Sequence, residues 1–163
     1  MANVLVGYAT RAGATKDVAE AIANGIGQAG HSVEVVDLKS PVDADGIDAV
    51  VVGSGIQAGV MYSEALDFLD RNATTLDGRP VAIFNVCMTA SDPAQHEAAL
   101  AYNKAAVGRA GNVVAQAAFA GRYVPAKVSW WKRWLLKGLN KSAQDNVDAT
   151  KAQAWGREVA GLI

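Results

Sequence analysis

The segment NVLVGYATRAGAT, residues 3–15, decides the fold of this 163-residue chain. It opens with a continuous apolar run, which is typical of a strand in a parallel sheet that helices cover on both faces. The turn Thr10-Arg11-Ala12-Gly13-Ala14-Thr15 follows, and apolar residues then recur at helical spacing as far as Ala29. A strand, a short turn and a helix in this order predict the start of an alternating α/β fold.

Further apolar runs and helical patterns continue this alternation along the chain. Only ten residues, 38–47, join the second predicted strand to the third, so we expect a loop or a single turn there instead of a crossover helix. We predict one α/β domain over residues 1–163, with a doubly wound sheet of five parallel strands. The predicted strands are 3–8, 32–37, 48–53, 80–86 and 112–120; the predicted helices are 15–29, with Thr15 as N-cap, 62–73, 93–108 and about 145–162.

The composition restricts the cellular compartment and the kinds of site that we expect. Cys87 is the single cysteine, so no disulfide can form within the chain, and the first residues lack the pattern of a signal peptide. No apolar run approaches the ~20 residues that cross a bilayer. The two histidines have no neighbouring metal-ligand spacing. We therefore expect a cytoplasmic protein without a metal site, and we expect no nucleic-acid partner.

The charges are unevenly distributed along the sequence. Residues 121–144 hold six basic residues and no acid, which leaves nine basic residues against sixteen acids in the rest of the chain. Three of the four tryptophans lie in the same segment, and a helix there would carry an aromatic face and a basic stripe. This insert, at about 121–143, could bind an anionic partner or membrane surface, or it could pack on the domain. The residues that we single out for substrate or membrane contact are Arg122, Tyr123, Trp130, Trp131, Lys132 and Arg133.

The turn after the first strand has the features of a phosphate site. Ligands of open parallel sheets bind beyond the carboxyl ends of the strands, where the strand order reverses. Gly13 permits a close backbone approach, and Thr10 and Thr15 add hydroxyl groups beside the free N–H groups of a helix start.

What the turn lacks restricts the ligand. It has neither the G-x-G-x-x-G pattern of dinucleotide sites nor the Gly-Lys-Ser/Thr of nucleoside triphosphate sites. The acidic residues that a response-regulator receiver needs after the first and third strands are also missing, since Ala9-Thr10 and Ser54-Gly55 stand there. A phosphate monoester such as that of FMN fits this hydroxyl-rich turn.

The pattern Thr10-x-x-Gly13-x-Thr15 after the first strand resembles the FMN-phosphate loop of flavodoxins. The resemblance spans nearly the whole chain and implies a flavodoxin-like sheet of order 2-1-3-4-5, with FMN as cofactor. It also implies that two further loops hold the isoalloxazine ring: Ser54-Gly55-Ile56-Gln57-Ala58-Gly59 and Val86-Cys87-Met88-Thr89. These loops offer Ile56, Val86 and Met88 instead of aromatic side chains, with Tyr62 and Tyr123 as the nearby aromatic candidates, so one face of the ring would stay open to a stacked substrate.

The basic insert, together with Ser54–Gly59, Tyr62-Ser63 and Phe68, resembles the flavodoxin-type, menaquinone-dependent protoporphyrinogen IX dehydrogenases. That resemblance implies an FMN enzyme of heme biosynthesis that oxidises an anionic porphyrinogen and passes electrons to a membrane quinone, as a peripheral protein on the inner face of the membrane. At Gln57-Ala58 the chain departs from the basic and aromatic residues expected there. The alternatives are a soluble flavodoxin that carries electrons between protein partners and a flavin-free scaffold. No residue is singled out as catalytic, because the cofactor would carry the chemistry.

Overall fold

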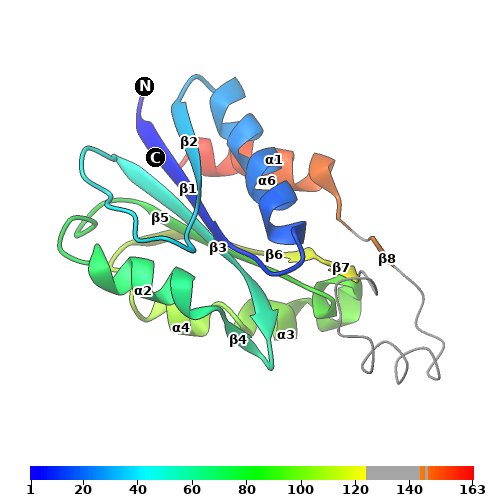
Figure 1. Ribbon diagram of the computed structural model, residues 1–163. Helices are drawn as coiled ribbons and strands as arrows, with labels where there is room; N and C mark the ends of the chain where they lie inside the picture. The colour runs from blue at the N-terminus through cyan, green and yellow to red at the C-terminus, as the bar shows by residue number, and fades with distance from the viewer. Residues whose placement is uncertain (124–143, 146) are drawn as a thin grey trace.

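The computed structural model describes residues 1–123, 144–145 and 147–163. Strands and helices alternate as predicted (Figure 1). Their bounds are β1 Asn3–Ala9, α1 Ala14–Gln28, β2 Ser32–Asp37, β3 Ala49–Gln57, β4 Val60–Met61, α2 Ser63–Arg71, β5 Val81–Cys87, the 3₁₀ turns η1 Thr89–Ser91 and η2 Pro93–Gln95, α3 His96–Ala101, α4 Lys104–Val107, β6 Val113–Ala120, β7 Arg122–Tyr123, β8 Gln144–Asp145 and α6 Ala149–Ala160.

The central sheet confirms the predicted doubly wound topology. Five parallel strands lie in the order β2-β1-β3-β5-β6, which is the order 2-1-3-4-5 when the five predicted strands are counted along the chain. The short strand β4 was not predicted and pairs antiparallel with the end of β3. The strand order reverses between β1 and β3, so a ligand site is expected at the carboxyl ends of these two strands.

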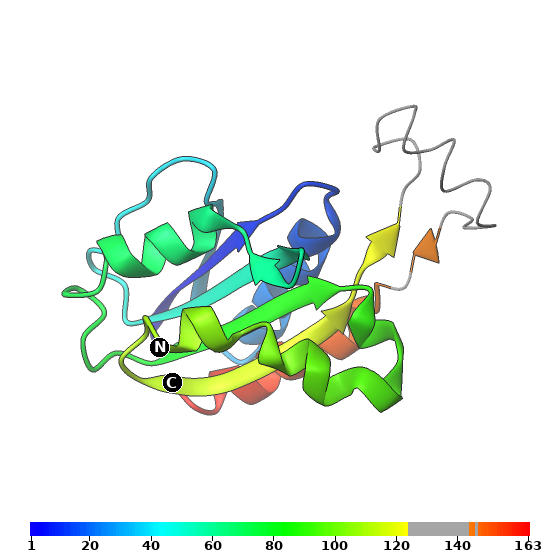
Figure 2. The ribbon, with the colours of Figure 1, turned by 90° about the horizontal axis from the view of Figure 1, so that it is seen from below.

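Two hydrophobic cores, one on each face of the sheet, explain the continuous apolar runs in the central strands. Helices α1 and α6 cover one face, and α2, α3 and α4 cover the other (Figures 1 and 2). Alternate residues of one strand serve different cores: Val6 packs with α1, whereas Leu5 packs with α2. Every residue of β5 is buried. Strands covered on both faces need apolar side chains on both, and this removes the alternating pattern.

Helices α1 and α6 approach each other closely because glycines face each other's backbone. A Cβ atom at Gly156 of α6 would lie 2.2 Å from the carbonyl oxygen of Ile22, and one at Gly25 of α1 would lie 2.1 Å from that of Gln153. No Cβ tolerates such distances, so both positions require glycine. The contact holds the C-terminal helix against the helix that begins at the phosphate turn.

The connection between β2 and β3 contains no helix, as predicted. Asn72, at the end of α2, holds this connection in place through its side chain. Its side chain donates hydrogen bonds to the carbonyls of Val42, at 3.0 Å, and Phe68, at 2.9 Å, and accepts one from the N–H of Ala44 at 2.9 Å. The loop is thereby fastened to α2, and Ala44 is fully buried.

The predicted helix over 93–108 is wrong in one respect, because it is broken in the middle. Asp92 caps its start and accepts a hydrogen bond from the N–H of Ala94, but α3 ends at Ala101. The buried side chain of Asn85 on β5 donates to the carbonyl of Ala99 and to Oδ1 of Asn103, both at 2.9 Å. Asn103 in turn donates to the carbonyl of Ala117 on β6 at 3.2 Å. Because the helix is broken, the side chain of Asn103 points into the interior, where its hydrogen bonds connect the break to β5 and β6.

The chain beyond β6 differs from the prediction at its C-terminal end. The last helix begins at Ala149 and not near residue 145, because Asp148 is its N-cap and accepts a hydrogen bond from the N–H of Lys151 at 3.0 Å. Asp145 instead pairs with Arg122 in the short β7-β8 ladder. The predicted contact residues Trp130, Trp131, Lys132 and Arg133 lie outside the described residues, and of Arg122 and Tyr123 only the backbone pairing is described.

Candidate cofactor site

A cavity of about 130 Å³ lies where the carboxyl ends of β1, β3 and β5 meet. Five separate segments line it: four follow or end a parallel strand, and the fifth, Tyr62, follows the short antiparallel strand β4. This is the point of strand-order reversal at which open α/β sheets bind ligands. The lining residues are Thr10, Arg11, Ala12, Ala14, Thr15, Gly55, Ile56, Tyr62, Val86, Cys87, Met88 and Gly121.

The turn after β1 prepares the start of α1 for an anion. Gly13 is the residue before the helix, with a left-handed φ of 87°, and its N–H donates to Oγ1 of Thr10 at 2.9 Å. The first N–H groups of a helix have no intrahelical partner, and no side chain caps those of α1. Since Ala14 and Thr15 line the cavity, these donors and the positive end of the helix dipole are directed toward it.

Thr15 lies inside the first turn of α1 and is not its N-cap, which corrects the prediction. The left-handed Gly13 closes the turn two residues earlier, and this moves Thr15 into the contact between α1 and β3. Its side chain is 2 % exposed, and its Oγ1 would lie 3.5 Å from a Cβ atom at Gly55. Because Thr15 lines the cavity, its hydroxyl group can donate a hydrogen bond to a ligand oxygen.

The first predicted ring loop is a β-hairpin and not a loop. Residues 54–57 continue β3, and Ala58 and Gly59, with φ of 52° and 79°, form the two-residue turn to β4. Two residues with positive φ match the twist of a tight hairpin. Only Gly55 and Ile56 of this segment line the cavity, whereas Gln57, Ala58 and Gly59 are exposed at the hairpin tip.

Ser54 positions an aromatic wall instead of contacting the cavity. Its fully buried hydroxyl accepts a hydrogen bond from the N–H of Tyr62 at 2.9 Å and donates to the carbonyl of Gly55 at 2.6 Å. The ring of Tyr62 is thereby held so close to Gly55 that a Cβ atom there would lie 2.9 Å from Cε2. Gly55 is therefore required for the position of this ring.

Arg11 connects the phosphate turn to this wall. Its guanidinium carbon lies 4.1 Å from the ring centroid of Tyr62, and its Nη2 is 2.7 Å from Oε1 of Glu64. Desolvation acts to raise the pKa of Glu64, but hydrogen bonds from its own backbone N–H and from Arg11, with the charge of Arg11, outweigh it and lower the pKa. Burial raises the pKa of the Tyr62 hydroxyl. The guanidinium group of Arg11 therefore lies against the ring of Tyr62, and Glu64 partly neutralises its charge.

The segment after β5 forms the opposite wall. Val86 and Cys87 end the strand, Met88 is exposed beside the cavity, and Thr89 begins η1 with its hydroxyl 3.4 Å from that of Tyr102. Burial raises the pKa of the Cys87 thiol, although the backbone N–H groups of Ala90 and Thr89 act to lower it. The thiol is thus protonated at neutral pH and behaves as a wall residue.

Of the lining residues, Gly121 falls outside the prediction, and Tyr62 was expected only as an aromatic candidate near the ring. Gly121 directly follows β6, and its N–H donates to the carbonyl of Cys87 at 3.1 Å. The topology alone signals this position, because the carboxyl ends of parallel strands share one edge. Tyr62 reaches the cavity only through the β3-β4 hairpin, which Ala58-Gly59 signals weakly in the sequence.

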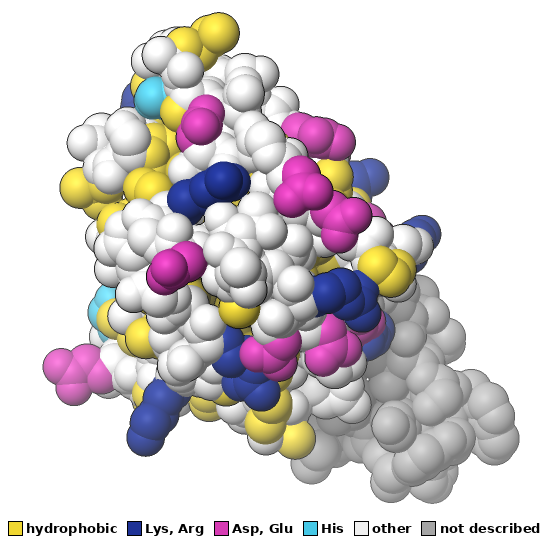
Figure 3. All heavy atoms as spheres, turned by 90° about the vertical axis from the view of Figure 1, so that its left-hand side faces the viewer, with side chains coloured by type: hydrophobic (Ala, Val, Ile, Leu, Met, Phe, Trp, Pro, Cys, Tyr) yellow, Lys and Arg dark blue, Asp and Glu magenta, His cyan; other side chains and the backbone are white. Residues whose placement is uncertain are grey.

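The rest of the described surface offers less chemistry. On the face in Figure 3, acidic and basic side chains are interspersed. No group of three or more His, Cys, Asp or Glu in the described ranges could hold a metal ion. Among the same residues, no helix has the length and apolar character needed to span a membrane.

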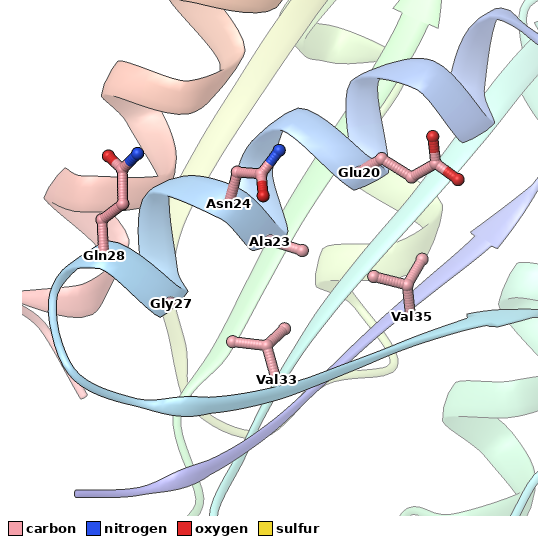
Figure 4. A pocket seen from close by; sticks show the side chains of 7 residues that line it. All are labelled: Glu20, Ala23, Asn24, Gly27, Gln28, Val33 and Val35. Atoms are coloured by element: carbon pink, nitrogen blue, oxygen red, sulfur yellow. The ribbon is translucent and has the colours of Figure 1, made fainter.

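A second hollow, of about 680 Å³, lies between α1 and β2 on the outside of the domain and is lined mainly by polar side chains of α1 and two valines (Figure 4).

Comparisons with known proteins agree with this fold. A family model described as "Flavodoxin domain" matches residues 5–150. The curated protein "Protoporphyrinogen IX dehydrogenase [quinone]" of Escherichia coli K12 is 23 % identical over 153 residues, which cover 91 % of this chain and 84 % of that protein.

Among solved structures, oxidised flavodoxin 2 of Bacillus cereus is 21 % identical with a TM-score of 0.66 and covers 99 % of this chain and 100 % of its own. A flavodoxin from the domain Archaea is 20 % identical with a TM-score of 0.63, covering 98 % and 97 %. At these identities the structural likeness shows the fold alone.

Proposed function

The chain belongs to the flavodoxin domain family, and on this premise we propose that it binds FMN in the cavity at the carboxyl ends of β1, β3 and β5 and acts as an FMN-dependent dehydrogenase. The observation that carries the proposal is the phosphate turn. The start of α1, which no side chain caps, and Thr15 line the cavity, beside the turn that the left-handed Gly13 closes. Free backbone N–H groups and hydroxyl donors at a helix start suit a doubly charged phosphate monoester.

Each wall of the cavity has a part in holding such a cofactor. FMN supplies the redox chemistry when bound, since its ring can accept electrons from one partner and donate them to another. The phosphate turn would bind the phosphate, and Tyr62, Ile56 and Met88 would contact the ring and exclude water from it. The protonated thiol of Cys87 keeps that wall uncharged.

The proposed substrate is an anionic porphyrinogen, and the proposed electron acceptor is a membrane quinone. Two observations support this choice: the similarity to the E. coli protoporphyrinogen IX dehydrogenase over 91 % of the chain, and the six basic residues and three tryptophans of residues 121–144. Basic residues attract propionate groups and anionic lipid headgroups alike. The protein would then work in the cytoplasm, at the inner face of the membrane.

A soluble flavodoxin that carries electrons between proteins is the second candidate. It is supported by the resemblance of the turn Thr10-x-x-Gly13-x-Thr15 to the FMN-phosphate loop of flavodoxins. The two candidates differ in what reduces the bound flavin. A dehydrogenase takes electrons from a small molecule, whereas a carrier takes them from a redox protein.

One reconstitution experiment separates these functions. Purified protein is titrated with FMN and then assayed for oxidation of protoporphyrinogen IX with menaquinone in anionic vesicles, or with a ferredoxin-type protein as the alternative partner. We expect stoichiometric FMN uptake and quinone-dependent oxidation. FMN uptake without porphyrinogen oxidation, combined with electron exchange with the protein partner, would support the carrier. Protein that takes up no FMN would overturn both candidates.

Two variant proteins, one changed in the cavity and one outside it, test whether FMN binding and activity depend on the cavity. The double variant Thr10→Ala, Thr15→Val removes both hydroxyls of the phosphate turn, and Thr74→Ala removes an exposed hydroxyl far from the cavity. Only the double variant is expected to lose FMN and activity. Equal losses in both variants would contradict the assignment of the cavity.

A further inference from the structure

The two edges of the sheet differ in how they are protected against pairing with another strand. The edge strand β2 carries two acidic side chains, Glu34 and Asp37, and the adjacent α1 adds Glu20 beside Val35 (Figure 4). Charged side chains are the usual means by which natural edge strands prevent pairing with another chain. The β2 edge is therefore protected.

The edge strand β6 lacks this protection. It is eight residues long, Val113–Ala120, and contains no charged residue and no proline. One irregularity in its pairing with β5 lies at its first residues, so the register is regular from Ala115 to Ala120. Among the described residues no strand pairs with its outer side. Figure 2 shows β6 at the rim of the sheet. Such an edge can accept another strand.

A hollow of about 790 Å³ runs along this edge, and its walls come from both faces of the sheet. Helix α6 forms one wall, and the segment from Ala90 to His96 forms the other. At its base the rings of Phe119 and Trp155 meet edge to face, with centroids 5.7 Å apart. The hollow therefore combines open backbone groups with an apolar base, as an interface core does.

Three charged residues line the wall at α6: Asp148, which caps the helix, and Lys151 and Glu158, which are placed for pairing with an identical copy. Lys151 and Glu158 of α6 are both exposed, both line the hollow and take part in no ion pair within the described chain. They are seven residues apart, so they lie on one face of the helix, about 10 Å from each other along its axis. The midpoint between them falls between Ala154 and Trp155. A two-fold axis through this midpoint sets two copies of α6 antiparallel and brings each Lys151 against the other copy's Glu158.

We propose that two copies of this chain associate through the outer edge of β6 and helix α6, with Lys151 of each copy facing Glu158 of the other. A two-fold contact pairs the same patch on both subunits, and the opposite charges on either side of Ala154 make this patch complementary to itself. The strands would pair antiparallel, so the two cofactor cavities would open at opposite ends of the dimer. Association is then independent of FMN.

Charge reversal tests the interface. Sedimentation velocity over a wide range of concentration is expected to show a dimer for the wild-type chain. The single variants Lys151→Glu and Glu158→Lys each place like charges together twice, and each should weaken the dimer roughly tenfold to hundredfold. The double variant K151E/E158K restores both pairs and should restore the dimer. An equimolar mixture of the two single variants should form the heterodimer, because each then complements the other.

The controls address folding and the choice of edge. Glu34→Lys, on the β2 edge, should leave the dimer unchanged. Circular dichroism and FMN uptake should be the same for all variants, because both charged side chains are exposed and distant from the cavity. Hydrogen exchange in β6 should slow as the wild-type concentration rises, and should not do so in Lys151→Glu. A monomer at every concentration, or a dimer that the single variants leave intact or the double variant does not restore, would overturn the proposal without affecting the proposed function.

Discussion

The two halves of the cofactor cavity are built in different ways. The phosphate turn is local: Gly13 and Thr10, three residues apart, close it, and α1 follows at once. The ring-side walls depend on contacts between separate elements, such as Ser54 of β3 with Tyr62 after β4 and Asn85 of β5 with Asn103 before α4. A local turn binds a group that is the same in every phosphate ester.

The largest effect is expected where the ring-side half depends on a buried network. Asn103→Leu leaves the side-chain amide of Asn85 and the carbonyl of Ala117 short of a partner in the interior, so we expect a loss of about 3 kcal/mol of unfolding free energy. Urea unfolding measures it, with the exposed Asn24→Ala as control. Hydrogen exchange should rise in residues 96–107 more than in residues 10–15. A uniform rise would show that the two halves are not separable.

The phosphate half can be disrupted alone. In the double variant Thr10→Ala, Thr15→Val the Kd for FMN should rise about a hundredfold, or about 2.7 kcal/mol, because two hydroxyl donors to a charged group are lost. The Kd for riboflavin, which has no phosphate, should stay unchanged. Fluorescence titration with both flavins measures the two constants. If riboflavin binding fell equally, the turn would not be the phosphate site.

The converse variant acts on the ring-side half. Gly55→Ala places a Cβ atom 2.9 Å from the ring of Tyr62, so the ring must move, at a cost of about 1–2 kcal/mol in flavin binding. FMN and riboflavin should weaken by the same factor. The same titrations test this, and Gly27→Ala, where a Cβ atom meets nothing within 4 Å, is the control. A selective loss of FMN would contradict the division of the cavity into two halves.

The smallest effect is expected at the link between the halves. Arg11→Met removes the ion pair with Glu64 and the charge over Tyr62, and since Arg11 is half exposed the loss should stay below about 1 kcal/mol. The pKa of Glu64 is lowered in the folded protein, so this contribution is present above the ordinary carboxyl pKa and disappears as the pH falls through the folded-state pKa. Thermal unfolding of both proteins as a function of pH measures it. A difference that grew on acidification would show that Arg11 acts otherwise.

The interruption of the predicted helix over 93–108 shows which structural features a local sequence pattern does not predict. The spacing of apolar residues predicted one helix over 93–108, and Asp92 and Pro93 do start a helical segment. The break follows from Asn85, which lies on a different strand and turns the carbonyl of Ala99 and the side chain of Asn103 toward itself. A pattern within one segment contains no information about such a partner. The hairpin at Ala58-Gly59 was missed for a related reason, since it is held by the hydrogen bond between Ser54 and Tyr62.

The sequence by itself determined the parallel sheet and the turn of residues 10–15, because both depend on neighbouring residues: β-branched runs for strands buried on two faces, and Gly13 beside two threonines for the turn. Only the tertiary structure decided the hairpin wall, the position of Arg11 on Tyr62 and the unprotected edge at β6. The hairpin joins neighbouring segments and the other features join distant ones, but all of them depend on contacts that exist only in the folded chain. Their free energy comes from burial and from hydrogen bonds that exist only after the sheet has brought the strand ends together.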